Sequence, residues 1–277
     1  MDYIRLSLVL AEDFHELLIA ELFDLDFEGF EEENNLLIAS IPANRFDDSK
    51  REEIERLLHQ FSTDSFIQSE ELINPQNWNE TWEQSIKPQS IGSFYVRPTW
   101  ADKSNDSGLV ELLIDPKMAF GTGYHATTRL ILEWLPEVIS KGDIVLDAGT
   151  GTGILAIGAL KLGAESAFGF DIDEWSKDNA EENMQLNGVS NFEVELGSIE
   201  VIPVGAKYDV ILANINRNAL IELIPQLLPY LKEGGKLLLS GLLHEDEETI
   251  RGLDSVKTIH HHETRSQQEW IAILFSK

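Results

Sequence analysis

Glycines and carboxylates near the middle of the chain have the types and spacing needed to hold a small cofactor. The segment 144–155 reads Ile-Val-Leu-Asp-Ala-Gly-Thr-Gly-Thr-Gly-Ile-Leu, a buried-strand pattern that ends in Asp147 and continues through Gly149 and Gly151. Glycines permit the sharp turn and let a ligand lie against bare backbone. The next strand pattern ends in Asp171, whose carboxylate could accept hydrogen bonds from a ribose diol. These residues predict a site for a nucleotide-like cofactor.

The glycines alone leave the identity of that cofactor open. Gly151, Gly153 and Ala156 also satisfy the dinucleotide-binding pattern G-x-G-x-x-A, with Asp171 following about 20 residues later. Asp147 argues for a different cofactor, because it directly precedes the turn and could anchor an amino-acid group where a dinucleotide needs room for its pyrophosphate.

Asn214 is a further candidate for the site. It lies at the carboxyl end of an apolar strand pattern at 208–215, and open α/β sheets bind ligands at that edge. A polar residue that closes an apolar strand favours a functional role, although a residue of the following turn remains the structural alternative.

The segment 115–128 reads Asp-Pro-Lys-Met-Ala-Phe-Gly-Thr-Gly-Tyr-His-Ala-Thr-Thr and matches D-P-x-x-A-F-G-T-G-x-H-x-T-T at every fixed position. Through this signature the chain resembles class I S-adenosylmethionine-dependent methyltransferases, and more closely the PrmA-type family that methylates ribosomal protein L11 of the large subunit. The resemblance extends with the right spacing through Asp147, Asp171 and Asn214, from about residue 78 to the C-terminus. The N-terminal third matches in length and pattern only.

The resemblance implies a role for each residue of the site. Gly149 and Gly151 would supply backbone beside the cofactor, and Asp171 would accept its ribose hydroxyls. Thr128, the last residue of the signature, would contact the cofactor. Asn214 would contact the cofactor or orient the incoming amine, which makes it the candidate catalytic residue.

Two of these cofactor contacts have simpler structural alternatives. Thr128 could serve only as a residue of a helix N-terminus. Asp147 could cap the turn that follows it.

The reaction implied is transfer of a methyl group from S-adenosylmethionine to lysine side chains and the N-terminal amine of ribosomal protein L11. The amine must be neutral to attack, whereas lysine has a reference pKa of about 10.4, so a desolvated site is required. No metal is needed, and the sequence offers no evident side-chain base.

Other functions stay open on the sequence alone. The glycine pattern would also serve an NAD-dependent oxidoreductase. An acidic, non-catalytic module could bind ribosomal proteins and transfer nothing. A methyltransferase could also act on a different protein or on a small amine.

Several other conspicuous residues carry less weight. His125 of the signature could line the pocket or only brace its loop, and Ser198 is a weak candidate for the adenine region. Three adjacent histidines at 260–262 cannot converge easily on a metal, because neighbours on a strand point to opposite faces. Trp78 and Trp82 lie one helical turn apart, which favours packing between domains.

Composition limits the class of protein. The 277 residues include no cysteine, which excludes disulfides and thiolate metal sites and fits a reducing compartment. No apolar run approaches membrane-spanning length, and the N-terminus carries acids where a signal peptide would be basic. A cytoplasmic protein without membrane contact is expected.

The chain is strongly acidic, with 21 basic and 49 acidic side chains and a formal charge of −28. The first 100 residues alone hold 21 acids against 7 basic residues. Such a surface repels nucleic acid and attracts a basic protein. The resemblance implies ribosomal protein L11 as the partner, and the charge favours the free protein over an RNA-covered ribosome, with no direct nucleic acid binding expected. Acidity could also serve solubility alone.

The elements that must position these residues fall into three regions. Residues 1–76 follow the order βαββαβ of a ferredoxin-like domain, with a helix that Asn44 caps, and would recognise the substrate. Residues 77–110 read as a linker helix and a hairpin, whose strands at 94–100 and 109–114 flank a polar turn. Residues 111–277 alternate helices and strands as in a Rossmann-like, doubly wound methyltransferase sheet, so the fold class is α/β.

Overall fold

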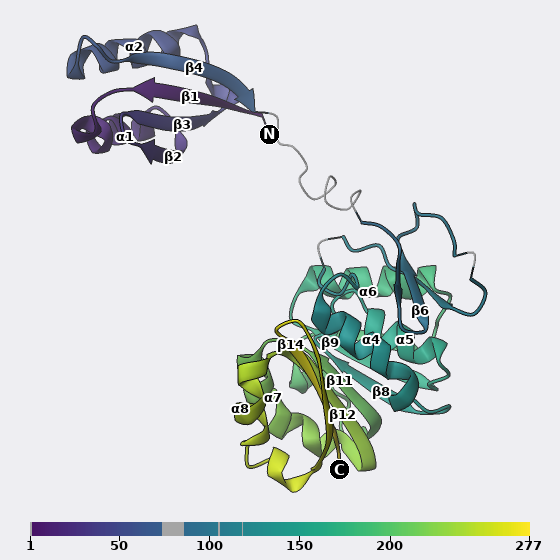
Figure 1. Ribbon diagram of the computed structural model, residues 1–277. Coiled ribbons are helices and arrows are strands. Elements are labelled where there is room, and N and C mark those ends of the chain that lie inside the picture. Colours follow the sequence, from purple (N-terminus) through teal and green to yellow (C-terminus); the bar gives the residue numbers. More distant parts are fainter. Residues whose placement is uncertain (1, 74–85, 105, 118) are drawn as a thin grey trace. The chain divides into compact units, whose positions relative to one another are not determined.

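The computed structural model describes residues 2–73, 86–104, 106–117 and 119–277. The chain divides into two compact units, Met1–Trp78 and Asn79–Lys277, and each has its own hydrophobic core (Figure 1). The linker helix expected near Trp78 and Trp82 falls outside the described residues.

The N-terminal unit is a four-stranded antiparallel sheet with two helices. Its strands lie in the order β2-β3-β1-β4, and all neighbouring pairs are antiparallel. This arrangement confirms the ferredoxin-like domain expected from the order βαββαβ. The elements are β1 Tyr3–Val9, α1 His15–Asp24, β2 Glu28–Glu33, β3 Leu36–Pro42, α2 Asp48–Phe61 and β4 Phe66–Ile73.

Helix α2 begins later than the sequence indicated. Its N-cap is Asp47, whose side chain accepts a hydrogen bond from the backbone nitrogen of Lys50 at 2.9 Å. Asn44, the expected cap, belongs to a short 3-10 turn, Ala43–Arg45. Asn and Asp are both strong N-cap residues, so residue type alone could not choose between the two positions.

The C-terminal unit is built on a seven-stranded sheet in the order β10-β9-β8-β11-β12-β14-β13. Neighbouring strands from β10 to β12 are parallel, whereas β14 runs antiparallel to both β12 and β13. The Rossmann-like sheet is thus confirmed, with an antiparallel strand near one edge. Its strands are β8 Ile144–Ala148, β9 Ser166–Asp171, β10 Phe192–Leu196, β11 Tyr208–Asn214, β12 Leu231–Leu243, β13 His260–Gln267 and β14 Trp270–Ser276.

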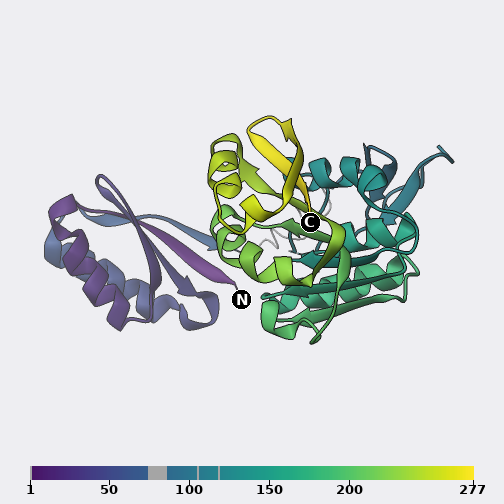
Figure 2. The same cartoon turned by 90° about the horizontal axis from the view of Figure 1, so that it is seen from below.

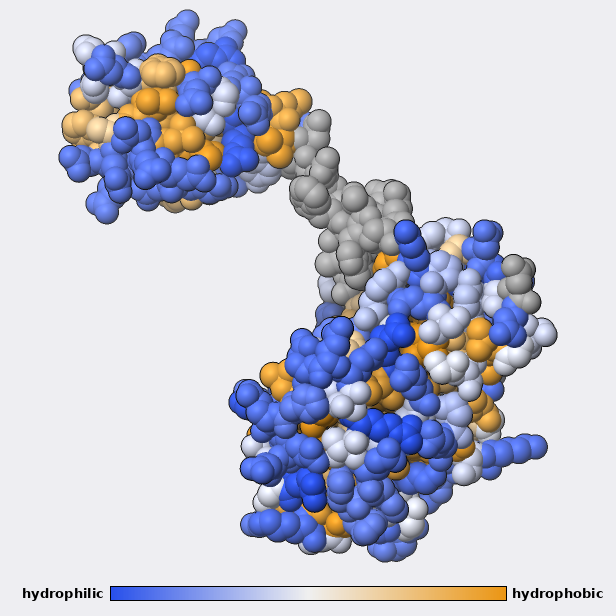
Figure 3. Space-filling model, viewed as in Figure 1, coloured by the Kyte–Doolittle hydropathy of each residue, from blue (hydrophilic) through white to orange (hydrophobic). Residues whose placement is uncertain are grey.

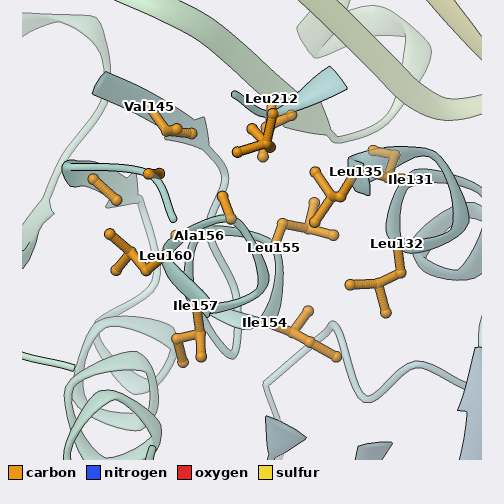
Figure 4. Close-up of a cluster of buried hydrophobic side chains, with 14 of the residues drawn as sticks. Ile131, Leu132, Leu135, Val145, Ile154, Leu155, Ala156, Ile157, Leu160 and Leu212 are labelled. Carbon is orange, nitrogen blue, oxygen red and sulfur yellow. The ribbon is translucent and has the colours of Figure 1, made fainter. Parts of the chain in front are cut away.

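Helices cover both faces of this sheet (Figures 1 and 2). The sheet needs cover on both faces because its strands are apolar on both. In β11, Val210 and Leu212 belong to one core cluster, and Ile211 and Ala213 belong to the other. Side chains of α4 and α5 pack beside Leu212 (Figure 4). The helices are α4 Ala126–Val138, α5 Ile154–Lys161, α6 Glu174–Leu186, α7 Arg217–Leu227 and α8 Glu247–Arg251.

The chain order of the strands reverses between β8 and β11. From β8 the chain proceeds to β9 and β10 on one side, and later from β11 to β12 on the other. Such a switch point leaves a crevice at the carboxyl ends of the two central strands. Asp147, Gly149 and Asn214 all lie at or just beyond those ends.

The prediction of a hairpin formed by strands at 94–100 and 109–114 is wrong. Strand β6, Phe94–Arg97, pairs in parallel with β7, Val110–Leu113, and its antiparallel partner is β5, Gln89–Ile91. Parallel pairing requires the chain to return to the starting end of β6 before β7 begins. The polar residues between the two strands therefore belong to this crossover connection. Composition does not distinguish such a connection from a tight turn. These strands pack into the core of the C-terminal unit through residues such as Phe94 and Leu112.

Hydrophilic side chains cover most of the surface shown in Figure 3. Apolar side chains also reach the surface of the N-terminal unit, where hydrophilic ones border them. Within the residues that the structure describes, no helix is both long enough and apolar enough to span a membrane.

Candidate functional site

A cavity of about 460 Å³ lies at the switch point of the large sheet. Residues singled out from the sequence line it from several elements: Gly149, Gly151, Asp171, Asn214, His125 and Ser198. The side chains of Thr128 and Asp147 are fully buried and are not part of its lining. The structure therefore brings most of the predicted site together and places these two residues in its support.

The glycine-rich loop after β8 is held by its neighbours on both sides. The backbone nitrogens of Gly149 and Thr150 donate to the carbonyl oxygen of Phe170 on β9, at 2.9 and 3.0 Å. Gly151 has a φ of +53°, and a Cβ atom there would collide with the carbonyl oxygen of Phe120 in the signature segment. Only glycine fits at this position, so the loop presents bare backbone to the cavity.

Asp171, at the end of β9, contacts this loop and still has capacity to bind a ligand. Its Oδ2 accepts a hydrogen bond from the Gly151 backbone nitrogen at 2.9 Å, and its Oδ1 accepts one from the Asp173 nitrogen at 3.1 Å. A carboxylate has about four lone-pair sites, so each oxygen can accept a further bond. On the cavity wall, the side chain can receive two hydroxyl groups of a diol.

Asp147 stabilises the loop from inside. Its Oδ2 accepts hydrogen bonds from the Thr150 hydroxyl at 2.9 Å and from the Ala156 backbone nitrogen at 3.2 Å, which joins β8 to the start of α5. Burial raises the pKa of this carboxyl group to about 7, and the two hydrogen bonds oppose that increase. These contacts are the ones expected if Asp147 caps the turn that follows it.

Asn214, at the end of β11, is oriented by Thr128. Its Nδ2 donates to the Thr128 hydroxyl oxygen at 3.1 Å, and both side chains are buried. Its Oδ1 has no hydrogen-bond partner among the described residues although it is buried. Thr127, one residue earlier on α4, lines the cavity where the sequence had suggested Thr128.

An aromatic group forms another part of the wall. The His125 ring packs against Phe120, at a centroid distance of 5.4 Å, and against Trp270, at 4.6 Å. His125 also caps α4, because its Nδ1 accepts from the Thr127 backbone nitrogen at 3.4 Å. It therefore both lines the pocket and braces the signature loop.

Sequence reasoning missed the apolar wall of the cavity, which consists of Phe120, Ile172, Ile215, Ala219, Leu223 and Trp270. Phe120 could have been found, since it is a fixed position of the signature. Trp270 carries no such local signal, because it reaches the cavity only through the position of β14 in the sheet.

A row of asparagines on α6 was also missed. Asn179, Asn183 and Asn187 are spaced four residues apart on one buried face of the helix. Asn183 accepts from the Asp115 backbone nitrogen at 2.9 Å and donates to the Thr152 carbonyl oxygen at 2.9 Å. The row thus ties the signature segment and the glycine-rich loop to the same helix.

The histidines at 260–262 lie on β13, away from the cavity lining. The His260 and His262 rings are 4.7 Å apart, and the His261 ring packs 5.6 Å from Phe275, so neighbours do alternate as expected. In the described part of the chain, no three histidine, cysteine or carboxylate side chains are placed to hold a metal ion.

Comparison with known proteins gives consistent matches. The family model described as ribosomal protein L11 methyltransferase (PrmA) matches residues 13–277. A ribosomal protein L11 methyltransferase of Porphyromonas gingivalis is 39% identical over 269 residues, 96% of this chain and 91% of that protein. One of Chlorobaculum parvum is 34% identical over 284 residues, covering 99% of this chain and 96% of that protein.

A solved structure extends the likeness to three dimensions. The crystal structure of a ribosomal protein L11 methylase from Lactobacillus delbrueckii subsp. bulgaricus superposes with a TM-score of 0.65 at 32% identity. The match covers 69% of this chain and 99% of that one.

Proposed function

The chain belongs to the ribosomal protein L11 methyltransferase family, and from this premise we propose that it methylates amino groups of ribosomal protein L11. It is an S-adenosylmethionine-dependent methyltransferase with a Rossmann-like fold. The proposed acceptors are lysine side chains and the N-terminal amine. Family membership favours S-adenosylmethionine over the nicotinamide cofactor that the glycine pattern alone also allowed.

The observation that carries the proposal is the unpartnered side-chain oxygen of Asn214, which lies in the same cavity as the glycine-rich loop. Buried polar atoms are normally hydrogen-bonded, so the Asn214 Oδ1, which lacks a partner among the described residues, calls for a ligand group. Gly149 and Gly151 line the cavity without side chains, and Asp171 has free lone pairs for a ribose. When bound, S-adenosylmethionine supplies a methyl group activated by its sulfonium.

We assign the site residues to binding and to positioning. Gly149, Gly151 and Asp171 would bind the cofactor directly. Thr128 would act through Asn214, because its hydroxyl oxygen fixes the orientation of the amide. Asp147 would act through the loop, because it holds the turn in shape from inside.

Asn214 is the proposed catalytic residue. Its Oδ1 would accept a hydrogen from the acceptor amine and thereby direct the nitrogen lone pair, which is the alignment that a displacement needs. Phe120 and Trp270 would exclude water from the amine on the aromatic side of the cavity. A dry site favours the neutral amine over its charged form.

The partner that we propose is free ribosomal protein L11, methylated in the cytoplasm. Ribosomal proteins bind RNA phosphates through Lys and Arg, so a free one is basic and is attracted to a chain of formal charge −28. The same charge opposes direct nucleic acid binding by this chain.

The test is transfer of labelled methyl from S-adenosylmethionine to purified ribosomal protein L11. We expect Asn214→Ala to lower kcat about 100-fold through lost alignment. Asp171→Ala should weaken cofactor binding by about 10- to 100-fold, because hydrogen bonds to a charged group are lost. The exposed residues Asn218 and Asp178 give matched controls, Asn218→Ala and Asp178→Ala, which should retain wild-type transfer.

The outcomes separate the parts of the proposal. Label in ribosomal protein L11 that is lost in both site variants supports function and site together. Cofactor binding without methyl transfer would leave the assignment as a methyltransferase intact and would show that the acceptor is a different molecule. Full activity of Asn214→Ala would overturn its catalytic role.

A further inference from the structure

The segment that follows β11 carries the proposed catalytic residue and leads directly into α7. It consists of Asn214, Ile215, Asn216 and Arg217, and we call it the rim segment. Its first three residues line the cavity, and its last residue begins α7. Thr128 contacts only the side-chain amide of Asn214, so the direction of the Asn214 Oδ1 also depends on what holds the backbone of the rim segment.

The rim segment is in close contact with two glycines. A Cβ atom at Gly241 of β12 would collide with the carbonyl oxygen of Ile215, and one at Gly149 would collide with the Cγ2 atom of the same residue. The rim segment therefore leaves no space for a side chain on β12 or on the glycine-rich loop at these points. A shift of its α7 end would displace the backbone that carries Asn214.

Asp246 holds the α7 end of the rim segment. It lies in a short 3-10 turn, His244–Asp246, and is 5% exposed. Its Oδ1 accepts a hydrogen bond from the Arg217 Nη1 at 3.0 Å, and its Oδ2 accepts one from the backbone nitrogen of Leu243, the last residue of β12, at 2.9 Å. A buried carboxylate needs a paired charge, and Arg217 supplies it. The carboxylate thus joins the end of β12 to the start of α7.

The position of Arg217 makes this pair important for the junction. The positive end of a helix dipole lies at the N-terminus, so an arginine at the first position of α7 is unfavourable unless an anion compensates it. Asp246 supplies that anion where the rim segment joins α7. The pair therefore fixes the geometry of the junction with a charged hydrogen bond, which is stronger than a neutral one.

We propose that Asp246 is a positioning residue for methyl transfer: through Arg217 it holds the rim segment in place and thereby directs the Asn214 Oδ1. The inference rests on the proposed function, in which this oxygen orients the acceptor amine. Asp246 does not belong to the described lining of the cavity, so it acts through the rim segment. Because a misplacement of about 1 Å can slow a reaction strongly, loosening the pair should slow the transfer step.

Asp246→Asn tests the proposal, because an amide keeps the size of the side chain and removes its charge. We expect kcat with ribosomal protein L11 to fall about tenfold, which is less than for Asn214→Ala because the Asn214 amide is displaced but still present. Affinity for S-adenosylmethionine, measured by calorimetric titration, should be unchanged, since Gly151 and Asp171 keep their contacts.

Asp209→Asn is the matched control. Asp209 also accepts hydrogen bonds from a cation, the Lys232 Nζ at 2.7 Å, and from a backbone nitrogen, that of Ile144 at 2.9 Å. It lies near the start of β11, the strand whose other end carries Asn214. The control therefore loses contacts of the same kind away from the cavity and should keep the wild-type kcat, which separates a positioning role from a general effect on folding.

Variants of Arg217 test whether the two side chains act as one unit. Arg217→Gln should lower kcat to about the same extent as Asp246→Asn, and the double variant should be no slower than either single variant, because the same contact is lost. Arg217→Lys should restore most of the kcat, since a single hydrogen bond to the carboxylate does not need the guanidinium fork. A side chain that only fills space would not show this rescue.

The results distinguish this inference from the proposed function. If the wild type methylates ribosomal protein L11 and Asp246→Asn is no slower than Asp209→Asn, Asp246 is not a positioning residue. A loss of cofactor affinity that matches the loss of kcat would also overturn the inference, because the whole site would then have changed. If Arg217→Gln raises the KM for ribosomal protein L11 and leaves kcat unchanged, Arg217 binds the acceptor protein and the inference is wrong. If the wild type transfers no methyl to ribosomal protein L11, the proposed function fails and takes the inference with it.

Discussion

Asp147 carries a carboxyl group that the fold keeps out of water. Its folded-state pKa of about 7 lies above the ordinary value of 3.8, chiefly because of burial. A group with a raised carboxyl pKa binds a proton more readily in the folded state. Its contribution therefore makes the free energy of unfolding fall as pH rises from about 4 to about 7, with little further change above that range.

Asp147→Asn should remove this pH dependence, because an amide does not titrate. Relative to wild type, the variant should become more stable as pH rises from 5 to 8, by up to roughly 3 kcal/mol. Urea unfolding of both proteins at the two pH values measures the difference. A stability difference that is the same at pH 5 and pH 8 would contradict the assignment.

The sequence located the wall residues that follow directly from strand ends. Gly149, Asp171 and Asn214 end or follow parallel strands, whose carboxyl ends share one edge, so their convergence could be predicted. Thr127 and Thr128 could not be told apart, because successive helical residues differ by about 100° in direction and the phase depends on packing. Such phases are set by tertiary contacts.

At the scale of elements, the signature segment and the glycine-rich loop form one structure. The Thr152 backbone nitrogen donates to the Phe120 carbonyl oxygen at 2.9 Å, and its hydroxyl donates to the Gly121 carbonyl oxygen at 2.7 Å. Displacing either segment therefore moves the other, so the proposed cofactor site depends on two loops that are separate in sequence.

Gly151→Ala should displace both loops. Its Cβ would collide with the Phe120 carbonyl oxygen, so we expect affinity for S-adenosylmethionine to fall at least about tenfold. Backbone strain at positive φ would in addition lower the free energy of unfolding by about 1–3 kcal/mol. Gly188→Ala is the matched control: its φ of +64° is similar, and nothing lies within 4 Å of the added atom. Isothermal titration and urea unfolding separate the two effects, and equal cofactor affinity in both variants would refute the prediction.

Helix α6 anchors the same two segments through Asn183. Asn183→Ala would leave the Asp115 nitrogen and the Thr152 carbonyl without these partners, so the free energy of unfolding should fall by about 3 kcal/mol. Gln185→Ala, at an exposed position of α6, should change it by less than about 0.5 kcal/mol. Chemical denaturation of both variants gives the comparison, and a loss as small as that of Gln185→Ala would show that the row of asparagines does not anchor the loops.

At the scale of the whole molecule, we expect the formal charge of −28 to make an assembled ribosome a poor substrate, since its RNA is also negative. We expect kcat/KM on free ribosomal protein L11 to exceed that on assembled large subunits at least about tenfold at equal low salt. The free-protein rate should fall as salt screens the attraction. Labelled methyl transfer to the two substrates measures this, and faster methylation of subunits would refute the electrostatic argument.

The architecture of both units could be predicted because periodic patterns and chain order constrain it. Alternation in β1 and β3 and helical spacing in α1 and α2 gave the ferredoxin-like order, and repeated strand and helix patterns gave the large sheet. The direction of β7 could not be predicted. Parallel and antiparallel pairing place similar apolar residues in a strand, and only the path of the intervening loop decides between them.

The described core clusters are each confined to one unit: Leu8 and Leu22 pack within the first, and Leu212 and Leu238 within the second. A substitution that alters packing in one cluster is therefore not compensated by residues of the other. Over evolutionary time, this separation lets the N-terminal unit diverge in sequence while the unit that contains the cavity stays under its own selection.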